Sequence, residues 1–341
     1  MNNVPLDADR ADTVRLSVAE ATALGMRALR RIGYNDEEAK IIVNHLLDNA
    51  LCGYGFTGLP RILAIAREDQ THDARTSDVR YPVKIANETP LSASVDGGNN
   101  VGYIAAHRGA DIAIEKARHG GLAVVGVYNS YYSGRNAYYV ERIVRAGYAC
   151  IHSSTAKPRV LPPGGARPAL GPNPICFGFP STNGPVVFDM ATAALSWGDV
   201  MLHAHLGKPL PEGSGFDARG APTLDAQQAL LGGVGTFGGH KGFGLSFAIQ
   251  ALGLLAGSAL TRGQVQDFAF LFLAINPDLL IPDGRFPQQM TELVTSIKAT
   301  PKQPGVTDIR IPSERAFRER ERRRQEGILL ERKVIELLNA L

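Results

Sequence analysis

Hydrophobic positions in the first 70 residues recur at the three- to four-residue spacing of amphipathic helices. Ser17 followed by Glu20 forms a capping-box pattern that predicts a helix start, and Gly33 marks the end of that helix. Two further helices are predicted over residues 35–51 and 59–68. The N-terminal part of the chain is therefore expected to form a helical layer.

Beyond residue 80 the pattern changes to short alternating or apolar runs between glycines and prolines. Strands are predicted over residues 83–95 (as a pair), 122–127, 148–152, 186–189 and 268–275. Helices are predicted over residues 103–119, 137–146 and 241–256, and over a C-terminal stretch whose apolar stripe includes Ile328, Leu329 and Val334. Residues 1–13 are expected to be disordered, and residues 158–184 and 206–226 to be irregular. The mixture of elements predicts an α/β (α+β) protein.

Composition narrows the class of protein. With 341 residues, 44% hydrophobic and 20% charged, the chain has the profile of a soluble globular protein of one large domain or two ordinary ones. The net charge of +3 is small, and the basic run over residues 315–324 is interrupted by Glu319 and Glu321. That alternation favours a solvated helix face, so we expect no nucleic-acid partner.

Cysteine usage and hydropathy indicate the compartment. Cys52, Cys150 and Cys176 form no CxxC pair, so we expect no metal site or redox dithiol, and we expect a reducing compartment. The longest apolar stretch, residues 245–260, is interrupted by polar residues and glycines and is shorter than the ~20 residues of a membrane span. The N-terminus lacks the apolar core of a signal peptide. These features predict a cytoplasmic protein without membrane contact.

A glycine-rich turn, Gly238-Gly239-His240-Lys241-Gly242, opens the helix predicted over residues 241–256. No G-x-G-x-x-G pattern follows a strand and opens a helix, so a Rossmann fold is not supported. A helix start with free backbone N–H groups and a lysine beside them binds anions well. The same glycines also suit a tight connection at positive φ, and the residues alone leave both interpretations open.

Six short segments follow one another in an order that resembles one enzyme family. They are Pro163-x-Gly165, Gly171-Pro172-Asn173-Pro174, Phe188-Asp189-Met190-Ala191-Thr192, Pro222-Thr223-Leu224-Asp225, Gly238-Gly239-His240-Lys241-Gly242-Phe243-Gly244-Leu245 and Pro312-Ser313-Glu314. They are similar to the motifs of the type-2 malate/L-lactate dehydrogenase family, which includes ureidoglycolate, sulfolactate and diketogulonate oxidoreductases and the cyclic ketimine reductases. Pro172 stands where the family has threonine, and Ser313 where it has glycine.

The resemblance implies a non-Rossmann nicotinamide-binding domain with a mostly antiparallel sheet, plus a helical domain formed by the two ends of the chain. The expected boundaries are residues 81–284 for the first domain, and residues 1–80 with 285–341 for the second. The resemblance also implies a homodimer and NADPH or NADH as cofactor. The expected cofactor-binding residues are Asn173, Phe188, Met190, Ala191, Thr192, His240, Lys241, Gly242, Ser313 and Glu314.

The resemblance further assigns residues around the substrate. Arg61 stands three residues after Gly58, where the family has an arginine that grips a substrate carboxylate. A planar guanidinium suits that role, although a solvated surface charge is the alternative for a lone arginine on a helix. Asn129 and Ser130 are retained and are expected to supply hydrogen bonds, and Asp189 stands where the family has the aspartate that orients the catalytic histidine.

Both histidine motifs of the family are changed. The usual Ser-His-Gly reads Phe56-Thr57-Gly58, and the usual Asn-Ser-x-His-x-Gly reads Asn129-Ser130-Tyr131-Tyr132-Ser133-Gly134. Tyr132 occupies the second histidine position. A phenol, whose pKa in water is about 10, keeps its proton at neutral pH and can donate it to a developing alkoxide or amine. Alternatively the tyrosines only fill the space of the histidine, and His240 is a further candidate acid.

These features support two functions. The first is NAD(P)H-dependent reduction of a small α-imino (cyclic ketimine) or α-keto acid, with Tyr132 in place of the histidine. The ketimine is favoured because a protonated iminium accepts hydride with least help from an acid. The alternative is a family-derived protein that has lost hydride transfer. Such a protein would act as a lyase, isomerase or condensing catalyst through Arg61 and Tyr132, or would only bind a ligand.

Overall fold

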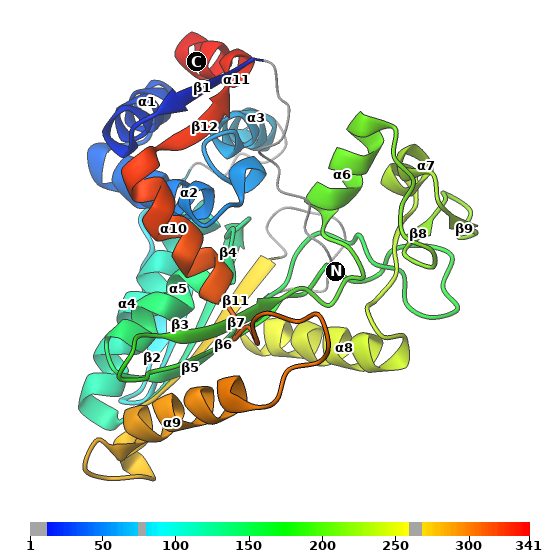
Figure 1. The fold of residues 1–341 in the computed structure, drawn as a ribbon. Helices are drawn as coiled ribbons and strands as arrows, with labels where there is room; N and C mark the ends of the chain where they lie inside the picture. The colour runs from blue at the N-terminus through cyan, green and yellow to red at the C-terminus, as the bar shows by residue number, and fades with distance from the viewer. Residues whose placement is uncertain (1–11, 74–79, 259–267) are drawn as a thin grey trace. The chain divides into compact units, whose positions relative to one another are not determined.

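The computed structural model describes residues 12–73, 80–258 and 268–341. The chain separates into two compact units, Met1–Val79 with Thr300–Leu341 and Arg80–Ala299 (Figure 1). Most of the predicted disordered segment, residues 1–13, lies outside the described residues, and Thr13 already belongs to a strand.

The first unit contains the predicted N-terminal helices. They are α1 (Val18–Arg31), α2 (Asp36–Leu51) and α3 (Arg61–Asp73), with the short 3-10 turn η1 (Gly55–Thr57) before α3. Ser17 and Asn35 cap α1 and α2, and in both helices a glutamate three residues later returns a hydrogen bond to the backbone of the capping residue. Each capping box satisfies two backbone groups that a helix end otherwise leaves open, so these two helix starts are confirmed.

The C-terminal stretch is not the single helix that its apolar stripe predicts. It forms α10 (Glu314–Glu326), β12 (Ile328–Glu331) and α11 (Arg332–Ala340). Gly327, at φ 86°, ends α10, and β12 then pairs antiparallel with β1 (Thr13–Leu16). The helix prediction was wrong because the partner of β12 lies at the other end of the chain, where a local pattern carries no information about it.

Within the described residues, the second unit is built on a seven-stranded sheet of order β2-β3-β4-β11-β5-β6-β7 (Figure 1). The strands are β2 (Lys84–Glu88), β3 (Ser92–Val101), β4 (Leu122–Tyr131), β5 (Ala149–Ser154), β6 (Ile175–Phe179), β7 (Val186–Met190) and β11 (Phe268–Ile275). Strands β3 and β4 are parallel because α4 (Gly102–Gly120) crosses between them, and the other pairs are antiparallel. The predicted fold class, with its mostly antiparallel sheet, is confirmed.

Helices pack on both faces of this sheet. The face under α4 and α5 (Asn136–Arg145) carries a cross-strand row of side chains, Val125, Phe272, His152, Cys176 and Asp189. On the opposite face Ala256, which follows α8 (His240–Leu255), packs against Leu271. Helix α9 (Arg285–Ala299) follows β11 and the 3-10 turn η3 (Pro277–Leu279).

Two segments predicted to be irregular contain regular structure. Strand β6 lies within residues 158–184, where the density of prolines and glycines hid it. Residues 206–226 contribute β8 (Gly215–Phe216) and β9 (Pro222–Thr223), which form a small antiparallel sheet with β10 (Gly233–Val234).

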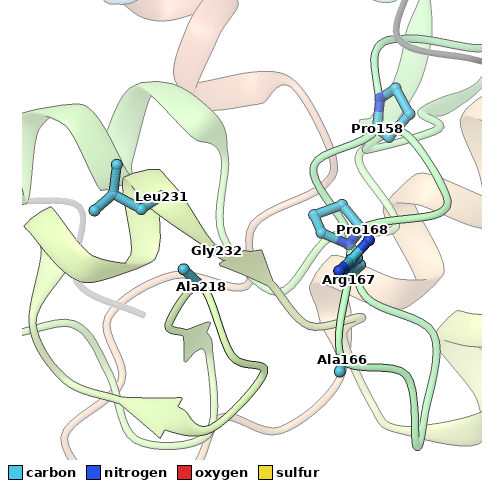
Figure 2. A pocket seen from close by; sticks show the side chains of 7 residues that line it. All are labelled: Pro158, Ala166, Arg167, Pro168, Ala218, Leu231 and Gly232. Atoms are coloured by element: carbon cyan, nitrogen blue, oxygen red, sulfur yellow. The ribbon is translucent and has the colours of Figure 1, made fainter.

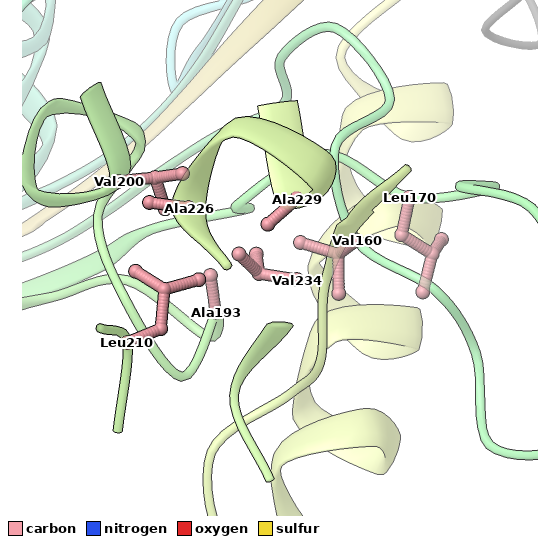
Figure 3. Packing of buried hydrophobic residues seen from close by; sticks show 8 residues of the cluster. All are labelled: Val160, Leu170, Ala193, Val200, Leu210, Ala226, Ala229 and Val234. Atoms are coloured by element: carbon pink, nitrogen blue, oxygen red, sulfur yellow. The ribbon is translucent and has the colours of Figure 1, made fainter. Parts of the chain in front are cut away.

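The small sheet has helices and a core of its own. Helices α6 (Trp197–Leu206) and α7 (Ala226–Leu231) accompany it. A separate cluster of buried side chains lies between these elements (Figure 3), and consists of Val160, Leu170, Ala193, Val200, Leu210, Ala226, Ala229 and Val234. Burial of these apolar side chains explains why a segment with little helix or strand pattern is ordered.

Candidate active site

Residues 129–133 form the last part of β4 and the turn that follows it in the second unit. Two of them have left-handed backbone conformations, Asn129 at φ 51° and Tyr132 at φ 41°. Such conformations are costly for residues with a Cβ and persist only where surrounding contacts enforce them. The segment that resembles the family's second histidine motif is therefore held in an uncommon geometry.

The adjacent tyrosines of this turn differ in accessibility. Tyr131 is 1% exposed and belongs to the core, whereas Tyr132 is partly exposed. The ring of Tyr132 meets the ring of Tyr103 edge to face, with centroids 5.8 Å apart and an interplanar angle of 64°. The hydroxyl of Tyr139 donates to the carbonyl of Ser133 over 2.6 Å. Of the two residues, only Tyr132 is partly open to solvent.

The polar side chains of Asn129 and Ser130, which lie in β4 before Tyr132, are engaged within the protein. The Asn129 amide donates to Asp96 Oδ1 over 2.8 Å and to the Tyr81 hydroxyl over 2.7 Å. The buried Ser130 hydroxyl donates to the carbonyl of Asn100 over 2.7 Å. Both side chains thus hold the backbone of the turn, a role the sequence pattern did not predict for them.

Asp189, at the end of β7, caps helix α5. Its Oδ2 accepts a hydrogen bond from the backbone N–H of Ala137 over 2.8 Å, while the preceding residue Arg135 makes no side-chain cap bond. Burial raises the pKa of Asp189, and the hydrogen bonds from Ala137 and Asn136 and the charge of Arg135 offset that rise only in part. The carboxyl that the family uses to orient a histidine is here bonded to the backbone that follows the Tyr132 turn.

The start of α8 has the properties of an anion site. Gly238 and Gly239 have φ of 55° and 60°, and a Cβ added to either would meet no atom within 4 Å. The first main-chain helical bond runs from Phe243 N to Gly239 O over 3.1 Å, so the preceding N–H groups are those that a helix leaves for a ligand. The first turn contains no acidic residue, and the side chains of His240 and Lys241 are exposed. This donor set fits the diphosphate of a dinucleotide.

Three of the predicted cofactor segments are joined by hydrogen bonds. The Asn173 amide donates to Ser246 O and to Gln250 Oε1, both over 3.1 Å, and so ties the Gly171–Asn173 turn to α8. Thr192 donates to the Pro172 carbonyl over 2.9 Å and accepts at its own carbonyl from Phe237 N over 3.0 Å. The backbone around Met190 and Ala191 is therefore fixed beside the start of α8, while Phe188 is 44% exposed.

The remaining predicted residues belong to the first unit. Arg61 is the first residue of α3 and is partly buried. Thr57, which stands at the first histidine position, donates its hydroxyl to the Tyr54 carbonyl over 3.0 Å. Ser313, at φ 65°, precedes α10, and the Glu314 carboxylate accepts from Ile311 N over 3.2 Å. Ser313 thus takes a conformation that the glycine expected at this position adopts readily.

Sequence patterns missed Asp96, Tyr81 and Tyr139, which contact the Tyr132 turn. A signal for Asp96 was present, because Asp96-Gly97-Gly98-Asn99-Asn100 has the composition of a tight turn. Tyr81 and Tyr139 carry no such signal, since their contacts depend on strand and helix packing.

A cavity of about 420 Å³ lies elsewhere in the second unit (Figure 2). Leu231, Gly232 and Ala218 line one side of it, and Pro158, Arg167 and the neighbouring Ala166 and Pro168 line the other. None of the predicted site residues lines it, and one exposed arginine gives it little chemistry of its own. Among the described residues there is also no cluster of three or more His, Cys, Asp or Glu side chains that could hold a metal, and no helix long and apolar enough to cross a membrane.

Comparison with known proteins agrees with the sequence resemblance. The malate/L-lactate dehydrogenase family model matches residues 16–339. The chain is 31% identical over 335 residues to the malate/(S)-sulfolactate dehydrogenase of Methanothermus fervidus, covering 96% of both chains. It is 32% identical over 343 residues to the delta(1)-pyrroline-2-carboxylate reductase of Pseudomonas fluorescens, covering 97% of this chain and 99% of the relative. Among solved structures, a delta1-piperideine-2-carboxylate reductase from Pseudomonas syringae pvar. tomato superposes with a TM-score of 0.86 at 27% identity, covering 96% of this chain and 99% of the other.

Proposed function

Because the chain belongs to the malate/L-lactate dehydrogenase family, we propose that it is a reductase of a small α-imino or α-keto acid, with Tyr132 as proton donor and NADH or NADPH as cofactor. The observation that carries the proposal is the hydrogen-bonded platform of the Asn173 turn, Thr192 and α8, which retains the segments expected to hold the cofactor.

The cofactor, when bound, supplies the hydride. We assign its diphosphate to the first turn of α8, where Lys241 adds a charge-assisted hydrogen bond to those of the backbone N–H groups. We assign the backbone of residues 188–191 to the same cofactor site.

The proton is assigned to Tyr132, because this residue is partly exposed and the neighbouring Tyr131 is buried. Reduction of a carbonyl requires a proton at the developing alkoxide, whereas reduction of an imine requires a proton at the imine nitrogen, which is far more basic than a carbonyl oxygen. A phenol is a weaker acid than an imidazolium. We therefore expect Tyr132 to protonate an imine more readily than a carbonyl. We therefore favour a cyclic ketimine that carries a carboxylate, with Arg61 binding that carboxylate through its guanidinium fork.

The alternative function, without hydride transfer, rests on one observation. Both histidine positions have changed, and the hydroxyl of Thr57 is bonded to the Tyr54 carbonyl. A lyase, an isomerase or a binding protein would retain Arg61 and Tyr132 but would show no turnover of reduced cofactor.

A homodimer is also part of the proposal. Helix α8 exposes an apolar stripe in which Phe247, Leu254 and Leu255 are 63%, 41% and 74% exposed. The spacing places these side chains along one side of the helix, and apolar patches of this kind mark contact surfaces. Sedimentation should show a dimer that Phe247→Glu converts to a monomer. As a control, Leu280→Glu replaces a leucine that is 84% exposed in another part of the unit, and the dimer should persist.

The central experiment combines binding and turnover. NADH and NADPH are titrated against the protein by fluorescence, and turnover is measured with delta(1)-pyrroline-2-carboxylate and with an α-keto acid. Tyr132→Phe should lower kcat by about 10²–10⁴-fold and leave the cofactor Kd unchanged, because only the hydroxyl is lost. Tyr148→Phe, which removes a partly buried phenol outside the 129–134 segment, should change neither quantity. Absence of binding by both cofactors would reject the reductase and leave the alternative.

A further inference from the structure

Strand β3 contains a bulge beside the Tyr132 turn, opposite a single residue of β4. The register of the parallel pair shifts between Asp96 and Asn100, which align with residues 128 and 130 of β4. Residues 97–99 therefore lie opposite Asn129 alone. Asn129 takes its left-handed conformation at this point, with φ 51°. The bulge in β3 and the backbone conformation of Asn129 thus occur together.

The Asp96 carboxylate lies at the centre of this bulge. It accepts hydrogen bonds from the Asn129 amide over 2.8 Å, from the Gly98 N–H over 2.9 Å, and from the Tyr81 hydroxyl over 3.0 and 3.1 Å. The residue is 8% exposed. Burial raises the pKa of Asp96, but the bonds from Gly98, Asn129 and Tyr81 and the charge of Lys84 lower it by more, so the group is ionised at neutral pH. The buried charge is thus satisfied by donors on three separate segments of the chain.

Backbone contacts extend this support to the rest of the turn. A Cβ added to Gly97 would lie 2.8 Å from the Asn129 carbonyl, and one added to Gly102 would lie 2.8 Å from Ser133 N. The Ser130 hydroxyl donates to the Asn100 carbonyl. The backbone at both ends of residues 129–133 therefore contacts the backbone of β3 and of the start of α4. A side chain at Gly97 or Gly102 would not fit between them.

We propose that Asp96 is a positioning residue for the reaction: its carboxylate fixes Asn129 in the left-handed conformation and thereby sets the direction in which Tyr132 presents its hydroxyl. The inference rests on the proposed role of Tyr132 as proton donor. Asn129 and Tyr132 are separated by two buried residues, so a backbone rotation at the first is passed to the second and is not absorbed between them. Asp96 itself needs no contact with substrate or cofactor.

The test is a double-mutant cycle of Asp96→Asn with Tyr132→Phe. An asparagine has nearly the shape of aspartate, but the bonds from Asn129 and Gly98 to the Oδ1 position lose their charge assistance. Its NH₂ group also takes the place of Oδ2, which accepts from the Tyr81 hydroxyl. In the wild-type background Asp96→Asn should lower kcat by about 10–100-fold, the effect expected of misplacing a reacting group by an ångström or less, with little change in KM or cofactor Kd. In the Tyr132→Phe background it should lower kcat by less than about 2-fold, because the hydroxyl that Asp96 positions is already absent.

Two further variants test the same contact by another substitution and provide a control. Tyr81→Phe removes one donor to the carboxylate and should reduce kcat in the same direction but less, even if Asp96→Asn folds poorly. Asp217→Asn is the matched control, because Asp217 also accepts backbone hydrogen bonds in a turn, from Arg219 and Ala221, and should not affect kcat.

A spectroscopic measurement tests positioning without catalysis. In protein labelled with ¹³C at tyrosine Cζ, the Tyr132 resonance is assigned by its loss in Tyr132→Phe. That resonance should shift or broaden in Asp96→Asn and stay in place in Asp217→Asn. The proposal is overturned if the resonance does not move, or if Asp96→Asn has equal effects on kcat in both backgrounds. If Tyr132→Phe alone has no effect on kcat, Tyr132 is not the proton donor and the proposed function is wrong. If both single variants lower kcat and their effects simply add, Tyr132 can still be the donor, but Asp96 does not position it.

Discussion

Acid should destabilise the second unit through one buried histidine. The His152 side chain is 0% exposed, stacks on Phe272 with ring centroids 4.0 Å apart and planes 2° from parallel, and bonds through Nδ1 to the Leu271 carbonyl over 2.9 Å. Its Nε2 is buried and makes no hydrogen bond to the described residues. Burial lowers the pKa of His152 from 6.5 to about 4, and the bond to Leu271 opposes that change only in part. Folding therefore requires a neutral imidazole.

The size and sign of the effect follow from proton binding. The unfolded chain takes up a proton near pH 6.5, whereas the folded protein resists it down to about pH 4. The contribution of neutral His152 to the free energy of unfolding is thus fully present above pH 6.5. It is lost as the pH falls from 6.5 towards about 4. At ~1.36 kcal/mol for each pH unit, the whole interval corresponds to about 3 kcal/mol of unfolding free energy. A loss of this order is a large fraction of the ~5–15 kcal/mol typical of a folded protein.

The assay uses the single tryptophan of the chain. Trp197 lies in the second unit, with the Arg159 guanidinium 4.2 Å from its ring, so its fluorescence reports unfolding of that unit. Urea unfolding is followed from about pH 8 to about pH 4.5 in the wild type, in His152→Phe and in His205→Gln, which removes an exposed imidazole. His152→Phe should be less stable at high pH by about 1 kcal/mol, because it loses the bond to Leu271. It should be more stable than the wild type at the acidic end.

The crossing of the two stability curves is the decisive result. If wild type and His152→Phe lose stability in parallel as the pH falls, the histidine is not the group responsible. If His205→Gln removes the same pH dependence, burial is not the cause.

Three further changes test the cofactor platform, the substrate contact and the helix cap. Lys241→Ala should weaken NADH or NADPH binding by about 1–3 kcal/mol in calorimetry without changing Tm, whereas Gly242→Ala should also lower Tm, because its Cβ would lie 1.9 Å from the Phe237 carbonyl. An unchanged Kd in Lys241→Ala would contradict the diphosphate assignment. Arg61→Ala should reduce kcat/KM for the carboxylate substrate by about 2–4 kcal/mol of transition-state free energy, and equal turnover of the substrate amide by the wild type would remove the carboxylate contact. Asp189→Ala should lower the free energy of unfolding by about 1 kcal/mol, because α5 loses its cap. Asp189→Asn keeps an acceptor for the cap and should lower it by less. Equal losses in the two variants would argue against capping.

Local signals in the sequence predicted the elements that depend on local contacts. The capping box of Ser17 and Glu20 involves residues three apart, and it appears in the structure. The glycines before α8 likewise mark the start of that helix, with Gly239 at its N-cap. The fold class could also be predicted, because family motifs recur in order along the chain.

Elements that depend on distant partners could not be predicted in this way. Strand β12 has an apolar pattern that also suits a helix, and only its pairing with β1 decides between the two. Strand β6 is held between β5 and β7, and its flanking prolines indicated turns. Tertiary pairing overrode local preference in both cases.

The candidate site shows the same division. Motif matching proposed Asp189 and Tyr132 as site residues but carried no information about their neighbours in space. The bond from Ala137 to Asp189 spans 52 positions, and the bond from Asn129 to Asp96 spans 33. The bond to Asp96 follows from the pairing of β3 with β4, and the bond to Asp189 from the packing of α5 on β7. Periodicity along the chain encodes neither.

The pairing of β1 with β12 has a consequence for biosynthesis. The first unit takes residues from both ends of the chain, while the second is one continuous segment, Arg80–Ala299. On the ribosome, Thr13–Leu16 emerge early and have no strand partner until Ile328–Glu331 are translated. All residues of the second unit are therefore synthesised before β12, the last strand of the first unit, has been translated. A chain that stops short of Ile328 would leave the β1 edge unpaired, and such an edge is a template for pairing with other chains.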